Sequence, residues 1–154
     1  MLKYLNTQVT FSEVPDEITL CINITGCKIG CKNCHSSYLA EDIGEELNSP
    51  SLKELISNNK GITCICFMGG DSNPLEVDAL AQFIKINYPI KTAWYSGRQE
   101  LSKDINLNNF NFIKLGPYIE DLGPLNSKTT NQRFYKIEEG KLVDITNLFW
   151  KNND

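Results

Sequence analysis

The sequence predicts an α/β fold: an open partial (β/α) barrel with a mostly parallel sheet and a C-terminal β-hairpin. Three observations support this prediction. Strand and helix patterns alternate between residues 49 and 115, as they do in parallel sheets with right-handed crossovers. Three successive strand patterns end in glycine-containing loops. The number of β/α units is too small for a closed eight-fold barrel, so we expect an open one.

Runs of strand length, either alternating or apolar, predict the strands of this sheet. The run Ile62–Met68 is largely apolar, which is typical of a parallel strand buried on both faces. A turn at Val14–Glu17 separates the first two strands. The expected strands cover residues 8–11, 18–24, 62–68, 91–95 and 109–115, and the expected terminal hairpin covers 133–137 and 141–145.

Helix-start signals predict two helices between these strands. Ser49 is a candidate cap with Pro50 in the first turn, and Asn73 with Pro74 repeats the pattern for a helix that runs to Asn87. Shorter pieces are expected elsewhere. They are an irregular helix within 36–47, a short helix over 99–103 and a last turn at 147–150.

Composition and charge restrict the class of protein. A chain of 154 residues is most simply one domain, 1–154, large enough for a real core. The start, Met1–Asn6, has no apolar signal-peptide region, and no apolar run is of membrane length, so we expect a cytoplasmic protein with no membrane partner. A net charge of −4 gives no electrostatic case for nucleic acid. Reduced cysteines then favour metal or redox roles over disulfides.

Three cysteines, Cys27, Cys31 and Cys34, follow the predicted strand 18–24 with the spacing C-x3-C-x2-C. Disulfides need specific Cα separations that so short a loop does not easily provide, whereas the loop can wrap a cluster. Thiolates select zinc, copper(I) or iron–sulfur. A [4Fe-4S] cube normally takes four cysteines, and a local set of three leaves one iron open, as catalytic metals require.

A zinc site is the alternative interpretation of these cysteines. It needs a fourth ligand, and His35 is poorly placed because it is adjacent to Cys34. Cys21, Cys64 or Cys66 could supply it, although the alternation of the strand 62–68 also suits Cys64 and Cys66 as small core residues.

Gly69, Gly70 and Asp71 end the buried strand 62–68. Two glycines let the backbone approach a ligand closely, and the acid can receive an ammonium group. A Gly-Gly-Asp triplet alone often marks only a turn. Its place at a carboxyl strand end, beside the cysteine loop, is where open α/β sheets bind ligands.

Together, the cysteine spacing and the Gly-Gly-Asp triplet resemble the radical S-adenosylmethionine (SAM) superfamily. The resemblance implies that Cys27, Cys31 and Cys34 hold a [4Fe-4S] cluster whose fourth iron is chelated by SAM. It also implies that Gly69, Gly70 and Asp71 bind the amino group of SAM. The remaining implied contacts are the backbone of Asn33, Cys34 and His35 against SAM, and Ser96 on the ribose; His35 as a surface contact and Ser96 as a turn residue remain open.

Most of residues 4–137 resembles the small activating proteins of anaerobic (class III) ribonucleotide reductase. The matching stretches are the cysteine loop with His35, Phe67–Asp71, Trp94–Gly97, Lys114–Tyr118 and Thr130–Arg133. This resemblance implies that one electron, from a donor such as flavodoxin or ferredoxin, cleaves SAM to a 5′-deoxyadenosyl radical. The radical takes a hydrogen from a glycine of the anaerobic ribonucleoside-triphosphate reductase and leaves a glycyl radical there.

A chain this short has no room for a lid over a small substrate, so we expect the partner's extended glycine loop to seal the site. The candidate partner contacts are Arg98, Asn131, Gln132 and Arg133, the last being equally a surface strand residue. Other functions remain open. They are a different glycyl-radical activase, a small-molecule radical enzyme such as a deazapurine synthase, and a non-catalytic zinc or iron–sulfur module.

Overall fold

The computed structural model describes residues 1–26 and 43–150. The predicted ligand cysteines 27, 31 and 34, with Asn33 and His35, lie outside the described residues. No helix in the described part is long and apolar enough to cross a membrane. The strands are β1 (Leu2–Thr10), β2 (Thr19–Ile24), β3 (Glu45–Leu47), β4 (Cys64–Met68), β5 (Lys91–Tyr95), β6 (Phe112–Leu115), β7 (Arg133–Glu138) and β8 (Lys141–Asp144); the helices are α1 (Ser49–Asn58) and α2 (Pro74–Asn87), with the short 3-10 helices η2 (Leu107–Asn109) and η3 (Thr146–Trp150).

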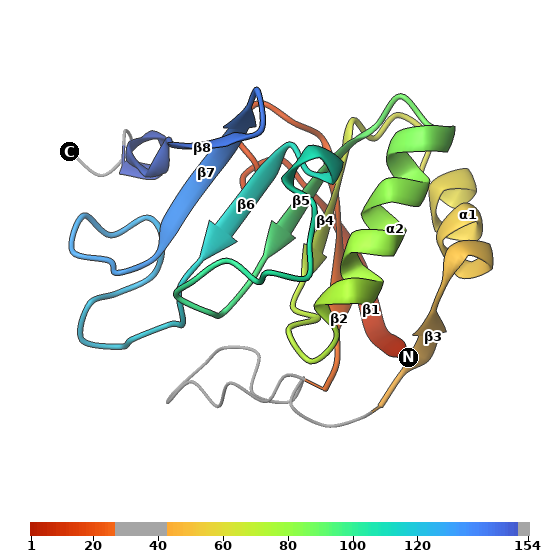
Figure 1. The fold of residues 1–154 in the computed structure, drawn as a ribbon, viewed down its shortest axis with the longest axis horizontal. Helices are drawn as coiled ribbons and strands as arrows, with labels where there is room; N and C mark the ends of the chain where they lie inside the picture. The colour runs from red at the N-terminus through yellow and green to blue at the C-terminus, as the bar shows by residue number, and fades with distance from the viewer. Residues whose placement is uncertain (27–42, 151–154) are drawn as a thin grey trace.

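All eight described strands form one sheet with the order β3-β1-β2-β4-β5-β6-β7-β8 (Figure 1). Its two edges, β3 and β8, do not pair with each other, so the sheet is open. The expected α/β class and the C-terminal hairpin of β7 and β8 are confirmed.

The prediction of a mostly parallel sheet is wrong. β2, β4, β5 and β6 are parallel, as expected, but four of the seven pairings between described strands are antiparallel. The cause lies in the flanking strands. Short turns join β1 to β2 and β7 to β8, and such connections permit only antiparallel pairing. β3 adds a further antiparallel pair, between Glu45–Leu47 and β1, where an irregular helix was expected.

Both helices form, and one cap differs from the prediction. α2 covers the expected residues, and the Asn73 side chain accepts from the Glu76 N–H at 3.3 Å. α1 is capped by Asn48 rather than Ser49. The Asn48 side chain accepts from the Ser51 N–H while the Ser51 hydroxyl accepts from the Asn48 N–H, both at 2.9 Å, and this reciprocal pair satisfies two otherwise free donors.

The expected short helix over 99–103 does not form; the chain there is irregular, and the next helical turn is η2. η3 confirms the expected last turn. Of the segment 36–47, residues 36–42 lie outside the described part.

The two faces of the sheet are covered differently. α1 and α2 lie on one face (Figure 1), where they bury the larger apolar core. Alternate strand residues point to the opposite face, as the pleat requires. That second core contains Cys21, Cys66 and Phe134, and Leu125 and Phe149 pack against its edge. Both faces of β4 are therefore buried, which explains its continuous apolar sequence.

Candidate functional site

The carboxyl ends of β2, β4, β5 and β6 meet at one edge of the sheet, because these neighbouring strands are parallel. We call this the carboxyl edge. β2 ends there at Ile24, three residues before Cys27. The Thr25 hydroxyl donates to the Ile43 carbonyl at 2.5 Å, so the described chain leaves and re-enters at neighbouring points of this edge. The predicted convergence of the strand-end loops is confirmed for the described loops.

Gly69 lies against the end of β2. Both Gly69 and Gly70 have positive φ angles, 103° and 91°. A Cβ on Gly69 would come within 3.3 Å of the Ile24 carbonyl oxygen, and one on Gly70 within 2.7 Å of Val77 Cγ2. Both the backbone conformation and the lack of space therefore require glycine. The glycines let this loop lie close to Ile24 and Val77, whereas the predicted close approach to a ligand stays a prediction.

Hydrogen bonds join the glycine loop to β5. The Gly69 N–H donates to the Tyr95 carbonyl at 3.0 Å. The Gly69 carbonyl accepts from the indole N–H of Trp94 at 2.7 Å. Trp94 is itself fully buried, so its ring and its one polar group both hold the loop. The loop is thus fixed between the ends of β2 and β5 before any ligand is considered.

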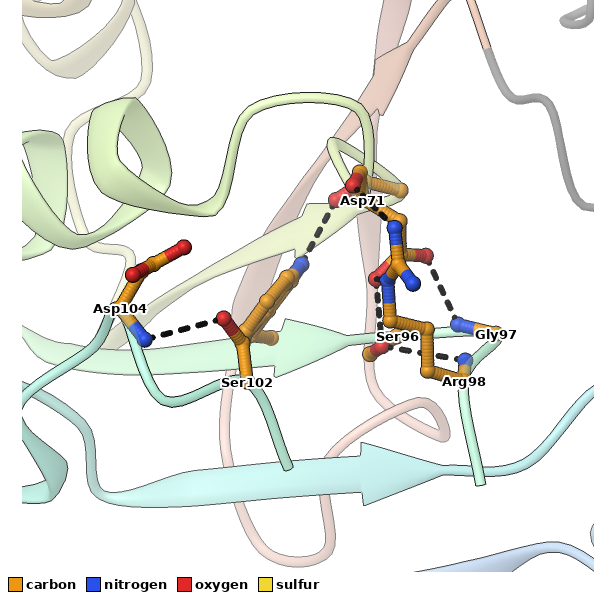
Figure 2. Close-up of polar contacts among 8 residues, drawn as sticks. Asp71, Ser96, Gly97, Arg98, Ser102 and Asp104 are labelled. Atoms are coloured by element: carbon orange, nitrogen blue, oxygen red, sulfur yellow. Dashed lines mark hydrogen bonds and ion pairs between the residues drawn. The ribbon is translucent and has the colours of Figure 1, made fainter. Parts of the chain in front are cut away.

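Asp71 is the centre of a polar network at the carboxyl edge (Figure 2). Asp71 is only 4% exposed. One carboxylate oxygen accepts from the Ser96 hydroxyl at 2.5 Å, and the other accepts from the Gly97 N–H at 2.9 Å. Charge-assisted bonds of this kind are roughly twice as strong as neutral ones. The orientation of the Asp71 carboxylate is therefore set by the first two residues after β5.

Arg98 completes the network from the solvent side (Figure 2). Its guanidinium donates to the Asp71 carbonyl at 3.0 Å, and its Nε lies 3.9 Å from a carboxylate oxygen. The Arg98 N–H also donates to the Ser96 hydroxyl at 3.2 Å. Since the Arg98 side chain is about half exposed, at 53%, solvent screens its ion pair with Asp71.

A cavity of about 680 Å³ adjoins this network. It lies between the start of α2 and the segment after β5, and its wall includes Asp71, Arg98, Ser102 and Asp104, which Figure 2 labels. The Ser102 hydroxyl accepts from the Asp104 N–H at 3.1 Å, so this wall is ordered by a local turn. Acidic, basic and hydroxyl groups all face one space, which suits a ligand that carries charges of both signs.

The Asp71 carboxylate fits an ammonium group. A carboxylate offers about four lone-pair positions. Ser96 and Gly97 occupy two of them, and the Arg98 ion pair is long. Acceptor capacity therefore remains on a charged group that borders a cavity. These remaining acceptor positions match, in chemical type, the N–H donors of an ammonium group such as that of SAM.

Ser96 is placed differently from a simple ribose contact. It is 1% exposed and its hydroxyl proton is directed to Asp71. The sequence prediction brought Ser96 to the right edge of the sheet, but the geometry makes it a positioning residue for Asp71. A contact with a ligand hydroxyl would use the remaining lone pair of the Ser96 oxygen.

The predicted partner contacts separate into different roles. Arg98 is engaged with Asp71. Asn131 donates to the Pro117 carbonyl at 3.1 Å, and the buried Gln132 donates to the Gly116 carbonyl at 3.4 Å. Arg133 is partly exposed and lies 3.7 Å from Asp144. Of the four, Asn131 and Gln132 brace the loop after β6, while Arg133 keeps an exposed guanidinium.

Lys114 is a further brace at this edge that the sequence did not suggest. Its ammonium is buried, donates to the Gly116 carbonyl at 3.0 Å and lies 5.5 Å from the centre of the Tyr95 ring. Burial is the main reason that the pKa of Tyr95 is raised well above its usual value. Only the alternation of β6 could have indicated that Lys114 points into the second core.

Sequence reasoning also missed Gly97 and Arg98 as the partners of Asp71. The stretch Trp94–Gly97 was singled out, and each strand end was expected at the same edge. One sequence signal could have indicated Gly97: it closely follows β5, which was expected to lie parallel to β4. Which donors face the carboxylate depends on loop geometry that no local pattern encodes.

Cys64 and Cys66 are fully buried, as their interpretation as small core residues predicts, and Cys21 is 4% exposed. Within residues 1–26 and 43–150, no three His, Cys, Asp or Glu side chains gather into a group that could hold a metal ion. Comparisons with protein-family models, with curated proteins and with solved structures found no match to this chain.

Proposed function

We propose that this chain is a radical SAM activase that generates a glycyl radical on an anaerobic ribonucleoside-triphosphate reductase. The observation that carries the proposal is the adjacency of two motifs. Cys27, Cys31 and Cys34 follow β2, and Gly69 lies against the last residue of that strand with Asp71 fixed close by. A partial barrel of radical SAM type, with the open sheet as its wall, belongs to the same proposal.

Each group of residues has a distinct part in this proposal. The three cysteines hold a [4Fe-4S] cluster, which together with bound SAM supplies one-electron cleavage of SAM and hydrogen abstraction from a glycine. Asp71 binds and orients the SAM ammonium group. Ser96 and Gly97 hold the Asp71 carboxylate in place, so its geometry is preorganised before SAM binds. The backbone near Asn33 and His35 provides further contacts.

The first experiment is anaerobic reconstitution with iron and sulfide, then reduction and addition of SAM. We expect a reduced [4Fe-4S] signal in paramagnetic resonance that changes on adding SAM, with 5′-deoxyadenosine as product. Cys34→Ala should abolish both, whereas Cys64→Ala, a core cysteine outside the motif, should keep both. A zinc protein, or a cluster indifferent to SAM, would replace this proposal with the non-catalytic binding module.

Arg133 provides the test of the protein partner. Arg133→Ala should lower glycyl-radical formation on the reductase by about 10-fold, because charged hydrogen bonds contribute roughly 1.5–3 kcal/mol. SAM cleavage without the reductase should stay unchanged. Lys136→Ala is the matched control, since Lys136 is on the same strand and is similarly exposed. Equal loss of both activities in Arg133→Ala would show that Arg133 does not contact the reductase.

The small-molecule radical enzyme is distinguished by the trigger for SAM cleavage. If a small molecule rather than the reductase stimulates formation of 5′-deoxyadenosine, the radical chemistry stands and the partner assignment falls. Flavodoxin and ferredoxin can be compared as donors in the same assay.

A further inference from the structure

Four sulfur-containing side chains lie on the sheet face opposite the helices. Cys64, Cys66 and Met68 alternate along β4, so all three point to this face. Cys21 of β2 is directly paired with Cys66 in the parallel register. The proposed activase site uses none of these side chains, which makes them a separate cluster of metal-ligating groups.

Three of the four sulfurs are linked by contacts. The Cys66 thiol donates to the Met68 thioether, with the two sulfurs 3.5 Å apart. Cys21 lies beside Cys66, because the two residues are directly paired in the register of β2 and β4. Cys66 is therefore the centre of the group, with a second thiol on one side and a thioether on the other.

The distance between the Cys66 and Met68 sulfurs suits ligands of one soft metal ion. Metal–sulfur bonds of about 2.3 Å place the sulfurs of a three- or four-coordinate site about 4 Å apart. The 3.5 Å separation of Cys66 and Met68 is already close to that value. A small movement of side chains, without a change in the strands, would let the three sulfurs surround one ion.

The donor types select copper(I). Thiolate and thioether ligands favour Cu(I), whereas structural zinc sites are closed by four ligands that are almost always cysteine, histidine or carboxylate. Apart from the Thr10 hydroxyl, 3.6 Å from Cys21 Sγ, the cluster around the sulfurs is apolar or aromatic and includes Val14, Ala93 and Phe134. Such surroundings exclude water, which suits a soft ion of low charge.

The protonation of the two thiols is consistent with this arrangement. The hydrogen bond with Cys66 is the main cause that lowers the pKa of Cys21. Burial raises the pKa of Cys66 well above its usual value. A bound cation would displace the protons of both thiols, and the one on Cys21 is the more easily lost.

We propose that Cys21, Cys66 and Met68 form a binding site for one Cu(I) ion on this face of the sheet. Binding forms two copper–thiolate bonds and one copper–thioether bond. It releases the two thiol protons to solvent and changes no oxidation state. Met68 is only partly buried, so it provides the route by which the ion reaches the buried pair.

The test uses Cu(I) alone, presented anaerobically as its bicinchoninate complex to the full chain. The background is Cys27→Ala, Cys31→Ala and Cys34→Ala, because those cysteines would also bind copper. We expect this background to take one Cu(I) per chain from the chelator. X-ray absorption should then show three sulfur neighbours at about 2.3 Å, as for other metal–sulfur bonds.

Three further substitutions identify the ligands. Adding Cys66→Ala should abolish uptake, and Met68→Leu, a volume-conserving change at a partly exposed position, should weaken it about 10-fold. Cys64→Ala is the matched control on the same strand and should take up one equivalent. Cys64 pairs with Thr19 of β2 rather than with Cys21, so it lies one step along the sheet from the proposed ligands. Circular dichroism confirms that each variant is folded.

The proposal would be overturned if the background took up no Cu(I). It would also be overturned if the Cys66→Ala and Met68→Leu forms each bound Cu(I) as well as the background does. A second comparison avoids the triple background. In the otherwise wild-type chain, Cys66→Ala should bind one equivalent fewer than Cys64→Ala, and equal stoichiometry would again overturn it. Because no step depends on SAM or a [4Fe-4S] cluster, this result is independent of the activase assay.

Discussion

The four parallel strands β2, β4, β5 and β6 are joined by different kinds of hydrogen bond at their carboxyl and amino edges. At the carboxyl edge, two buried side chains join β5 to the loop after β4: Ser96 donates to Asp71, and Trp94 donates to the Gly69 carbonyl. At the opposite, amino edge, the strands are joined mainly by backbone hydrogen bonds that continue the pairing of the sheet. Lys91 N–H donates to the Thr63 carbonyl at 3.0 Å, and Thr63 N–H donates to the Ile18 carbonyl at 2.8 Å.

Each edge also has a carboxylate beside a half-exposed cation. At the amino edge Glu17, with a side chain 9% exposed, lies 3.0 Å from Lys91. Asp71 at the carboxyl edge is buried and held by three neighbouring residues. A buried carboxylate costs desolvation free energy unless it is fully bonded. At the carboxyl edge the carboxylate is held by a hydroxyl and a backbone N–H in addition to the cation, so this edge is the place to look for function.

The largest expected effect on stability tests the glycine loop. Gly70→Ala should lower the free energy of unfolding by about 2–5 kcal/mol, because an alanine Cβ would sit 2.7 Å from Val77 Cγ2 at a positive φ. Gly61→Ala is the matched control at the amino edge. Gly61 has φ +94° but no described atom within 4 Å of the added Cβ, so we expect a loss of only about 1 kcal/mol.

Denaturant unfolding measures both glycine variants. Similar losses in Gly70→Ala and Gly61→Ala would mean that backbone strain alone matters and that the packing difference between the edges is unimportant.

A smaller structural effect, with a functional one, is expected for Asp71→Asn. An amide that keeps the Ser96 bond would turn an N–H group toward the Gly97 N–H, and an unsatisfied buried donor costs about 1–3 kcal/mol. Loss of the carboxylate should also lower SAM cleavage about 10- to 100-fold, as expected for a charged hydrogen bond of roughly 1.5–3 kcal/mol. Thermal unfolding and the 5′-deoxyadenosine assay measure the two effects.

Asp78→Ala separates stability from function in that experiment. Asp78 accepts from the Asn106 N–H at 2.8 Å and from the Asn109 side chain at 3.0 Å, both at one carboxylate oxygen. Its removal leaves both donors without this acceptor, so we expect a comparable loss of stability with SAM cleavage retained. If Asp78→Ala loses SAM cleavage as severely as Asp71→Asn, the effect of Asp71 is general destabilisation.

The smallest effect is expected at the amino edge. Glu17→Gln removes the charge that faces Lys91 but keeps a side chain of the same shape. Because Lys91 is half exposed, solvent screens the pair, and the loss should be less than about 1 kcal/mol with no change in SAM cleavage. A larger loss in denaturant unfolding would show that this edge also depends on a specific side-chain contact.

Local patterns predicted much of the fold. The bounds of α2 and β5 agree with prediction because Asn73 and Pro74 mark a helix start, and Ser96 and Gly97 mark the end of the strand. β3 and the missing helix at 99–103 were mispredicted. Glu45–Leu47 has too few residues to show a period, and its strand conformation comes from pairing with β1.

The candidate site was predicted only to the level of its edge. Gly69, Asp71 and Ser96 were expected to lie near one another because each follows a parallel strand, and they do. The contacts of Asp71 depend on loop conformation. They are the bonds from the Ser96 hydroxyl and the Gly97 N–H to its carboxylate, and from the Arg98 guanidinium to its carbonyl. Predicting those contacts would have required the loop geometry itself.

By itself the sequence determined the order of the elements, the glycine endings of the strands and the cysteine spacing, because each depends on residues close in the chain. The tertiary structure alone decided that four of the seven described pairings are antiparallel, and that Cys21 lies beside Cys66. Strand direction and register are set by burial and packing between distant segments, which a local pattern of residues does not encode.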